Sequence, residues 1–293
     1  MKQLTVISGK GGTGKTTITA SFAILANNPV IADADVDAPD LHLILAPKPF
    51  ETIPYVGMKV AVRDDTLCKL CAECRKHCRF EAIDEELNII EDMCEGCGVC
   101  AHICPNDAIT LKPTPAGYAY MSETRAGPMS HAVLKPGAST SGKLVTLVRE
   151  NARKLASRYN RELIIVDGPP GIGCPVIAAI VGVDLVLIVT EPSVTAIHDM
   201  ERILEVVTHF HIPVLVCINK CDLNPPMTHK IEHYCKTRNV EVAGKLPFDK
   251  AATMAMVAGK SVVEFDDSLL AQQLRILWEH IDMGLKNSYN PLL

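Results

Sequence analysis

Eight of the twelve cysteines lie in one short stretch, and their spacing is that of metal ligands. They form two runs of the pattern C-x2-C-x2-C-x3-C, which contain Cys68, Cys71, Cys74 and Cys78, and then Cys94, Cys97, Cys100 and Cys104. Cysteine thiolates bind zinc and iron-sulfur clusters. Structural zinc usually pairs two C-x2-C halves across a longer gap, whereas here four cysteines fall within about eleven residues, twice. The spacing therefore favours iron-sulfur clusters, with zinc or an empty site as the alternative.

The remaining cysteines, Cys174, Cys217, Cys221 and Cys235, are scattered, and an isolated cysteine is usually a small buried hydrophobe. The beginning of the chain, MKQLTVISGK, does not resemble a signal peptide, and the longest apolar stretch is interrupted by Asp184. We therefore expect a cytoplasmic chain without a membrane span. Because cytoplasmic thiols stay reduced, a disulfide framework is not expected.

A second chemical signal lies close to the start of the chain. Gly9, Gly14, Lys15 and Thr16 satisfy the phosphate-binding pattern G-x-x-x-x-G-K-[ST], with a strand-like run before it and a helix-compatible run after it. The glycines allow backbone N–H groups to surround phosphates at a helix N-terminus. Lys15 would reach the β- and γ-phosphates, and the Thr16 hydroxyl would bind Mg²⁺. The alternative is a chance glycine-rich turn.

The elements that must position these residues alternate between strands and helices. Apolar runs that predict strands occur at 3–7, 29–35, 162–167, 185–190, 213–218 and 240–246, and helical patterns occur at 16–26, 195–209 and 226–237. Such alternation predicts an α/β fold with a mostly parallel sheet covered on both faces.

The alternation stops between residues 60 and 112, where the cysteines crowd together. Residues 68–83 and 94–109 match at an offset of 26, cysteine for cysteine, and both end in Ala-Ile. We interpret this stretch as a small duplicated module inserted into the larger domain. Residues 113–143 are rich in proline and glycine, including Pro136 and Gly137, and we expect them to form an irregular return path.

Charge and amphipathicity bear on possible partners. The formal net charge is −5, so the chain lacks the overall basic character that favours nonspecific nucleic-acid binding. Residues 267–285 have helical apolar spacing, but the opposite face is not rich in lysine or arginine. We expect this helix to dock on the sheet, and we expect no nucleic-acid or membrane partner.

The loop KGGTGKTT, from Lys10 to Thr17, resembles the deviant Walker A loop of the MinD/ParA-type P-loop ATPases. The resemblance implies ATP and Mg²⁺ as ligands and an ATP-dependent homodimer. In that family the extra lysine, here Lys10, reaches the partner's phosphates in trans, in the manner of an arginine finger. A solvated surface charge is the alternative for Lys10. The residues that this resemblance assigns to ATP are Gly9, Lys10, Gly11, Gly12, Thr13, Gly14, Lys15, Thr16, Thr17, Asn219, Asp222 and Pro247.

Further family motifs follow in order. The segment ADADVDAPD resembles switch I, in which Asp33 would support the Mg²⁺ ion and Asp35 would orient the attacking water. The segment DGPPGIG resembles switch II, with Asp167 beside the Mg²⁺ shell and Gly168 and Gly171 permitting movement. The resemblance therefore assigns the Mg²⁺ site to Thr16, Asp33 and Asp167. Lys10, Lys15 and Asp35 are the candidate catalytic residues.

The cysteine runs resemble those of bacterial two-cluster ferredoxins, in which the fourth cysteine of each run binds the other cluster. The resemblance implies two 4Fe-4S clusters. One would be held by Cys68, Cys71, Cys74 and Cys104, and the other by Cys78, Cys94, Cys97 and Cys100. Pro105 follows the second run as that pattern requires, whereas Arg79 replaces the proline after the first.

The whole chain therefore resembles MinD-superfamily ATPases that carry an inserted ferredoxin domain. The expected domains are a P-loop ATPase domain in two parts, 1–59 and 113–293, and an inserted α+β ferredoxin-like domain at 60–112. Relatives with a cluster that bridges two subunits use a pair of cysteines per chain. Here Cys174 stands alone just past switch II with no C-x-x-C nearby, and we expect it to be buried in packing.

Three functions follow from this combination. The first is an ATP-driven dimer switch coupled to electron transfer to a partner protein or metal centre. The second is an ATP-dependent assembly factor that loads an iron-sulfur or metal cofactor into a client. The third, a MinD-like positioning protein, is disfavoured by the polar face of the C-terminal helix.

Overall fold

The computed structural model describes residues 1–135 and 142–286, which divide into two compact units. The first unit contains Met1–Thr52, Ala119–Val133 and the described residues from 142 onward. The second contains Ile53–Tyr118 with Leu134 and Lys135, so the predicted insert at 60–112 lies inside it. Pro136 and Gly137 of the expected return path lie outside the described residues.

The strands are β1 (Lys2–Ser8), β2 (Val30–Asp33), β3 (Lys48–Arg63), β4 (Ile109–Thr124), β5 (Gly127–Leu134), β6 (Leu163–Pro170), β7 (Leu185–Thr190), β8 (Val214–Asn219) and β9 (Glu241–Leu246). The helices of the first unit are α1 (Lys15–Leu25), α2 (Leu41–Leu45), α5 (Gly142–Arg158), α6 (Cys174–Ile180), α7 (Val194–His209), α8 (Pro225–Thr237), α9 (Ala251–Val257), α10 (Val262–Phe265) and α11 (Leu269–Lys286). Those of the second unit are α3 (Glu73–His77), the 3-10 helix η1 (Glu91–Met93) and α4 (Val99–His102).

The sheet has the strand order β3-β4-β5-β2-β6-β1-β7-β8-β9, and the pairs from β5 to β9 are parallel. The predicted mostly parallel α/β fold is therefore confirmed. Parallel strands end at one edge of the sheet, and here that edge carries the loop after β1, Asp33 at the end of β2, and the segment that begins with Asp167 in β6. The sheet brings these segments together although they are far apart in the sequence.

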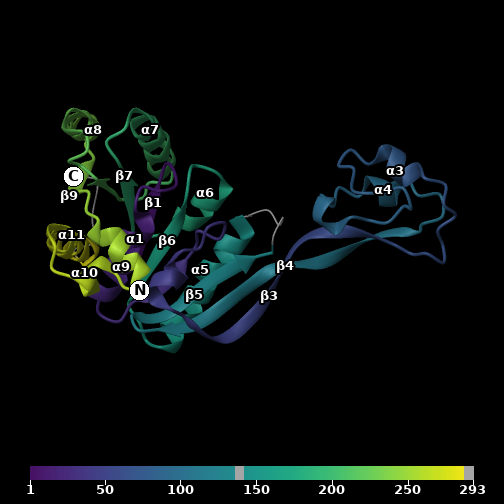
Figure 1. Ribbon diagram of the computed structural model, residues 1–293, viewed down its shortest axis with the longest axis horizontal. Helices are drawn as coiled ribbons and strands as arrows, with labels where there is room; N and C mark the ends of the chain where they lie inside the picture. The colour runs from purple at the N-terminus through teal and green to yellow at the C-terminus, as the bar shows by residue number, and fades with distance from the viewer. Residues whose placement is uncertain (136–141, 287–293) are drawn as a thin grey trace. The chain divides into compact units, whose positions relative to one another are not determined.

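Helices cover both faces of the sheet (Figure 1), and a cluster of buried hydrophobic side chains lies on each face. On one face α1, α10 and α11 pack against Leu4, Val6 and alternate residues of β7, and on the other α6, α7 and α8 pack against Ile7 and the intervening residues. Successive side chains of a strand point to opposite faces, so a strand covered on both sides is apolar throughout. This explains the continuous apolar run of β7, whose six residues are all buried.

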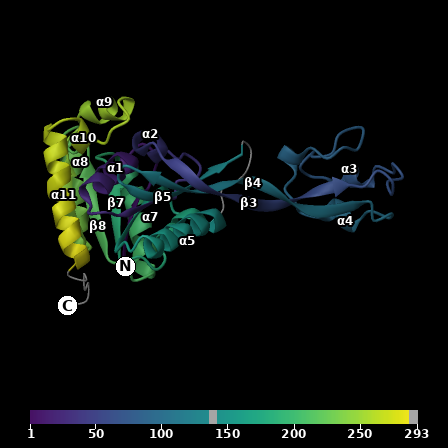
Figure 2. The ribbon, with the colours of Figure 1, turned by 90° about the horizontal axis from the view of Figure 1, so that it is seen from below.

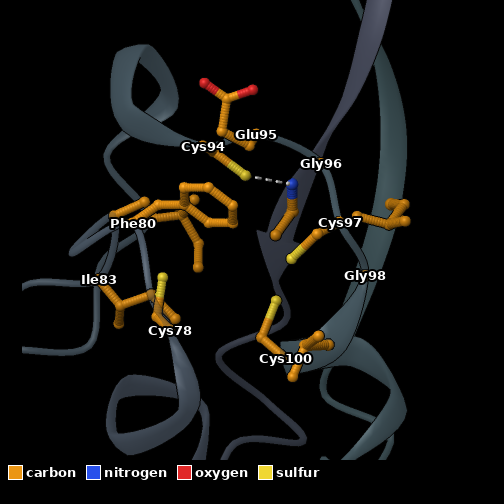
Figure 3. Close-up of a pocket in the computed structure, with 14 residues that line it drawn as sticks. Cys78, Phe80, Ile83, Cys94, Glu95, Gly96, Cys97, Gly98 and Cys100 are labelled. Atoms are coloured by element: carbon orange, nitrogen blue, oxygen red, sulfur yellow. Dashed lines mark hydrogen bonds between the residues drawn. The ribbon is translucent and has the colours of Figure 1, made fainter.

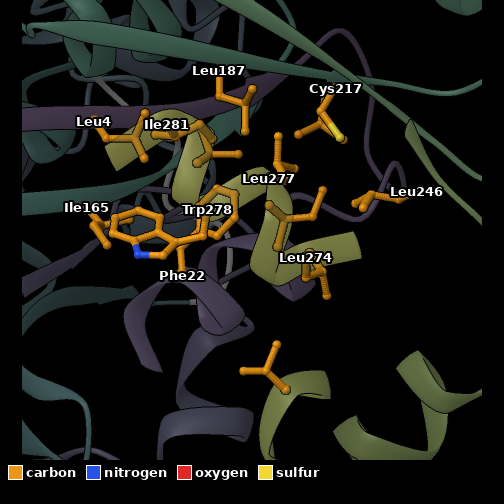
Figure 4. Close-up of a cluster of buried hydrophobic side chains, with 14 of the residues drawn as sticks. Leu4, Phe22, Ile165, Leu187, Cys217, Leu246, Leu274, Leu277, Trp278 and Ile281 are labelled. Carbon is orange, nitrogen blue, oxygen red and sulfur yellow. The ribbon is translucent and has the colours of Figure 1, made fainter. Parts of the chain in front are cut away.

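The C-terminal helix α11 packs its apolar stripe against the sheet and α1, as expected (Figures 2 and 4). Leu274, Leu277 and Ile281 are fully or almost fully buried, and the Trp278 ring lies 5.2 Å from the Phe22 ring of α1. This stripe is therefore used inside the fold. Among the described helices, none is both long enough and apolar enough to cross a bilayer.

The expected irregular path at 113–143 is wrong over most of its described length. β4 continues to Thr124, a two-residue turn at Arg125 and Ala126 follows, and β5 runs to Leu134. Proline and glycine favoured a loop, but Pro113 and Pro115 lie in the part of β4 that belongs to the second unit. Tertiary pairing of the strands overrides the local preference there.

The second unit repeats its backbone as well as its sequence. Leu70, Ala72 and Glu81 have positive φ angles of 54°, 60° and 53°, and the residues 26 positions later, Gly96, Gly98 and Asp107, have φ angles of 62°, 79° and 49°. α3 and α4 begin at equivalent points, each after the second of these turns. The duplicated sequence thus forms a duplicated structure around a small core that includes Ala61, Ile83 and Ile109.

Candidate nucleotide site and cysteine pockets

The phosphate-binding loop connects β1 to α1 and ends at Gly14. Gly14 precedes the first turn of α1 with a φ of 96°, a conformation that favours glycine. A Cβ atom there would overlap the Asn219 amide, which donates a hydrogen bond to the Thr13 carbonyl (2.7 Å). Asn219, at the end of β8, therefore holds the loop in place. The free N–H groups at the start of α1 can bind phosphate.

Lys15 and Asp35 face each other at the sheet edge. The Lys15 Nζ lies 3.8 Å from Asp35 Oδ2, and both side chains are almost completely buried. Burial raises the pKa of Asp35 to about 6, although the positive charge of Lys15 opposes the shift. A carboxylate with a pKa near neutrality can accept or orient a proton of a water molecule.

Asp33 at the end of β2 and Asp167 within the adjacent strand β6 form a buried acidic pair, and they are partners in the parallel register. Thr19 donates to Asp167 Oδ1 (3.0 Å), but both oxygens of Asp33 and Asp167 Oδ2 have no hydrogen-bond partner within the described residues. Burial raises the pKa of Asp167 to about 6, and burial with the negative charge of Asp167 raises that of Asp33. Unpartnered carboxylate oxygens in a buried acidic pair fit Mg²⁺, which prefers oxygen ligands.

Lys10 is held within its own chain. Its ammonium forms a 2.6 Å ion pair with Glu191 Oε1, directly after β7, and lies 3.3 Å from Ser193 Oγ. Glu191 Oε2 also accepts from Lys220 (3.0 Å), which donates in turn to the Gly12 carbonyl (3.0 Å). Sequence analysis missed Glu191 and Lys220. The available signal was their position, since each directly follows a buried strand at the same edge of the sheet.

The two predicted base-binding segments are tied together. Asp222 Oδ1 accepts a hydrogen bond from the Phe248 backbone N–H (2.6 Å), next to Pro247 at the end of β9. One carboxylate oxygen of Asp222 is thus already used within the protein. Contact of Asn219, Asp222 and Pro247 with a purine stays a prediction.

The eight cysteines of the second unit line two separate pockets, four in each. Cys78, Cys94, Cys97 and Cys100 line one pocket together with Phe80, and their sulfur atoms point into it from different sides (Figure 3). Cys68, Cys71, Cys74 and Cys104 line the other. Each pocket therefore contains three cysteines of one run and the fourth of the other. Four sulfur donors around an apolar space fit a 4Fe-4S cluster at each pocket.

Backbone groups of the second unit also face the cysteine sulfurs. The Ala61 N–H donates to Cys94 Sγ (3.4 Å), and the Ala108 N–H donates to Cys104 Sγ (3.3 Å). Such bonds stabilise a negatively charged sulfur and tune the potential of a cluster bound to it. Gly96 allows the Cys94 loop to pass close to β3, because a Cβ atom there would overlap the Lys59 carbonyl. Among the described residues, no three His, Cys, Asp or Glu side chains are grouped to hold a single metal ion.

Of the scattered cysteines, Cys217 and Cys235 are buried as expected, and Cys221 is half-buried. The expectation for Cys174 is wrong, because its side chain is exposed. It is the first residue of α6 and follows the exposed Gly173. Cys174 therefore has no part in the core.

Comparison with known proteins agrees with this geometry. A family model described as the CobQ/CobB/MinD/ParA nucleotide binding domain matches residues 4–262. The chain belongs to this family. The fold of this MinD/ParA-family chain is similar to that of the cell division ATPase MinD of Pyrococcus furiosus, with a TM-score of 0.58 at 19% identity over 96% of this chain and 98% of that one.

Two further similarities cover the whole chain and the cysteine region. The uncharacterized protein MJ0578 of Methanocaldococcus jannaschii is 34% identical over 286 residues, which are 95% of this chain and 96% of that protein. The uncharacterized ferredoxin MJ0199 of the same organism is 38% identical over 56 residues, which are 17% of this chain and 90% of that protein. The chain is therefore a nucleotide-binding P-loop protein of an ATPase family with a ferredoxin-like segment.

Proposed function

We propose that this chain is a cytoplasmic Mg²⁺-dependent ATPase that dimerises on ATP and couples that switch to electron transfer through two 4Fe-4S clusters. The observation that carries the proposal is the sorting of eight cysteines into two four-cysteine pockets, in a chain whose other unit has a complete phosphate-binding loop. When bound, the clusters would supply one-electron transfer to a partner protein or metal centre. The residues of the first unit would supply the switch.

In this proposal Lys15 and the N-terminus of α1 bind the phosphates, and Thr16 with Asp33 and Asp167 holds Mg²⁺. Asp35 orients the attacking water, and Lys10 leaves Glu191 to reach the phosphates of the second protomer. The buried acidic pair supports this assignment, because its orphaned oxygens need a cation. Loss of the γ-phosphate would free the segments after Asp33 and Asp167.

A continuous path of strands supports coupling between the switch and the ferredoxin-like unit. β2 ends at Asp33 and pairs with β5 at Ile31 and Met129. A two-residue turn joins β5 to β4, and β4 begins in the second unit at Ile109. A shift of β2 would therefore act on β5. β5 is the neighbour of β4, the strand that returns from the cysteine pockets.

The test is an anaerobic redox titration of the cluster-loaded protein followed by EPR, without nucleotide and with a slowly hydrolysed ATP analogue. A shift of about 60 mV, a tenfold change for one electron, supports coupling. Lys15→Ala is the control, and its clusters should show no nucleotide-dependent shift. Unchanged potentials together with an unchanged rate of electron transfer to every acceptor tested would refute the proposal.

A second candidate is an ATP-dependent assembly factor that transfers a cluster to a client. The exposure of one cysteine in each pocket, Cys71 and Cys97, favours it, because an incoming ligand can reach an exposed sulfur. This function predicts that an apo-acceptor removes iron from the protein faster with ATP than without it. Full retention of iron in both conditions would exclude it.

A further inference from the structure

The two halves of the duplicated unit differ in residue type around their exposed cysteines. We define the Cys71 patch as Leu67, Lys69, Leu70, Cys71 and Lys76, and the Cys97 patch as the residues 26 positions later, Met93, Glu95, Gly96, Cys97 and His102. In both patches the cysteine and the first apolar residue are exposed. The other three positions change in chemical type. The Cys97 patch therefore serves as a reference for the Cys71 patch within the same unit.

Charge separates the patches. Lys69 lines the pocket of Cys68, Cys71, Cys74 and Cys104, whereas its counterpart Glu95 lines the other pocket. Lys69 makes no ion pair with any described residue, and Lys76 pairs only with Glu73, at 2.7 Å and with 65% of the lysine side chain exposed. Exposed ion pairs of this kind are weak. The Cys71 patch therefore offers positive charge to a partner.

Lys76 is also close in sequence to the exposed cysteine. It lies on α3, five residues after Cys71, and its side chain is largely exposed. Its counterpart His102 lies at the end of α4, where an imidazole replaces the lysine ammonium. The Cys71 patch thus carries two lysines where the Cys97 patch has a glutamate and a histidine.

Leu70 is the second distinguishing feature. Its side chain is 68% exposed, and its φ of 54° is unfavourable for a residue with a Cβ. The counterpart Gly96 has nearly the same φ without that cost. Leu70 adds little to the core of the unit, and its exposed side chain is free to contact a partner.

From these observations we infer that the Cys71 patch, and not the Cys97 patch, is the docking surface for an acidic one-electron carrier protein. Leu70 supplies the apolar centre, and Lys69 and Lys76 supply a charged rim beside the pocket that Cys71 lines. The inference rests on the proposed function. In the exchange, the reduced carrier would lose one electron and a cluster held by Cys68, Cys71, Cys74 and Cys104 would gain it, with no bond or proton transferred.

The first measurement is the affinity of the cluster-loaded protein for an oxidised, strongly acidic single-cluster ferredoxin. NMR titration at several salt concentrations gives this affinity. We expect Lys69→Glu to weaken binding about tenfold and to reduce its salt dependence. Glu95→Gln, in the equivalent position of the other patch, is the matched control and should change the affinity less than about twofold. A larger effect of Glu95→Gln, or preferential binding of basic cytochrome c, would overturn the assignment.

Leu70→Gly separates docking from a structural role, because the two roles predict opposite changes in the unfolding midpoint. Docking predicts a higher unfolding midpoint, from relief of the positive φ, together with weaker binding of the ferredoxin by about fivefold or more. A structural role predicts a lower midpoint and unchanged affinity, which would refute the proposal for Leu70. Neither readout uses ATP, so failure of docking is distinguishable from failure of nucleotide coupling.

Discussion

At the scale of single residues, the most informative contact is that of Lys10 with Glu191. The family resemblance gives this lysine a partner in another protomer, whereas within one protomer it is paired with Glu191 and Ser193. The Lys10 side chain is 35% exposed and that of Glu191 is 19% exposed, so the pair is only partly screened by solvent. The pair must separate before Lys10 can act in trans. Glu191 would thus oppose dimerisation.

Glu191→Gln should make ATP-dependent dimerisation tighter by about fivefold, because a neutral amide holds the lysine less strongly. Analytical ultracentrifugation with a slowly hydrolysed ATP analogue measures this change. Lys10→Ala is the companion variant, and we expect it to bind ATP normally but to lose hydrolysis that rises with protein concentration. A wild-type kcat in Lys10→Ala would refute the trans role.

Backbone strain in the first half of the duplicated unit gives a second prediction. Ala72 has a φ of 60° where the second half has Gly98 at 79°. Ala72→Gly should therefore stabilise the cluster-loaded unit by about 1 kcal/mol, and Gly98→Ala should destabilise it by a similar amount. Denaturation by guanidinium, followed by visible absorbance under anaerobic conditions, measures both. Equal stability of the two variants would contradict the prediction.

At the scale of elements, Arg125 ties the β4–β5 turn to the rest of the first unit. Its guanidinium donates to both oxygens of Glu264 at 2.7 and 2.8 Å, and also to the Ile44 and Gly259 carbonyls at 2.6 and 3.2 Å. Ile44 belongs to α2, which follows switch I, and Glu264 forms the capping box of α10 with Ser261. One side chain thus connects the returning strand to the elements around the nucleotide site.

The pKa of Glu264 is lowered to about 2 because hydrogen bonds from Arg125 and Ser261 outweigh its partial burial. Above its unfolded pKa of about 4.5 the carboxylate stabilises the fold fully, and this contribution is lost as the pH falls toward 2. Glu264→Gln should be less stable at neutral pH and should lose less stability between pH 4.5 and 2.

Thermal unfolding followed by circular dichroism over that pH range tests this prediction. Glu205→Gln, which changes an exposed carboxylate on α7, is the control and should follow the wild-type curve. If Glu264→Gln lost as much stability as the wild-type protein between pH 4.5 and 2, the Glu264–Arg125 contact would not account for the loss of stability at acid pH.

At the scale of the whole molecule, the nucleotide residues and the cysteine pockets belong to different compact units. No residue that lines either cysteine pocket belongs to the phosphate-binding loop, within the described part of the chain. Binding of nucleotide and binding of iron should therefore be separable by mutation, even if the two units are coupled energetically.

Lys15→Ala should abolish nucleotide binding and leave the iron content at the wild-type level, and Cys71→Ala should reduce the iron content and leave nucleotide binding unchanged. Iron analysis and calorimetric titration with ATP measure the two properties. Loss of iron in Lys15→Ala would mean that the ferredoxin-like unit folds only with an intact nucleotide site.

Local sequence alone determined a large part of this protein. The phosphate-binding loop, the two cysteine runs and most strands of the parallel sheet are readable because each depends on residues a few positions apart, as in Gly9 to Thr16 or Cys94 to Cys104. The sequence also indicated that α11 docks through its apolar stripe. The sorting of the fourth cysteines, Cys78 and Cys104, came only from the resemblance to ferredoxins and stays a prediction as a ligand assignment.

Only the tertiary structure decided which distant groups meet. Glu191 and Lys220 reach Lys10 and Gly12 because β7 and β8 end at the same sheet edge as β1, and nothing in their local sequence encodes that meeting. β4 and β5 form despite prolines and glycines because pairing within the sheet outweighs local propensity. The exposure of Cys174 at the start of α6 is likewise set by the tertiary structure. Spacing determines local chemistry, whereas long-range packing determines which side chains become neighbours.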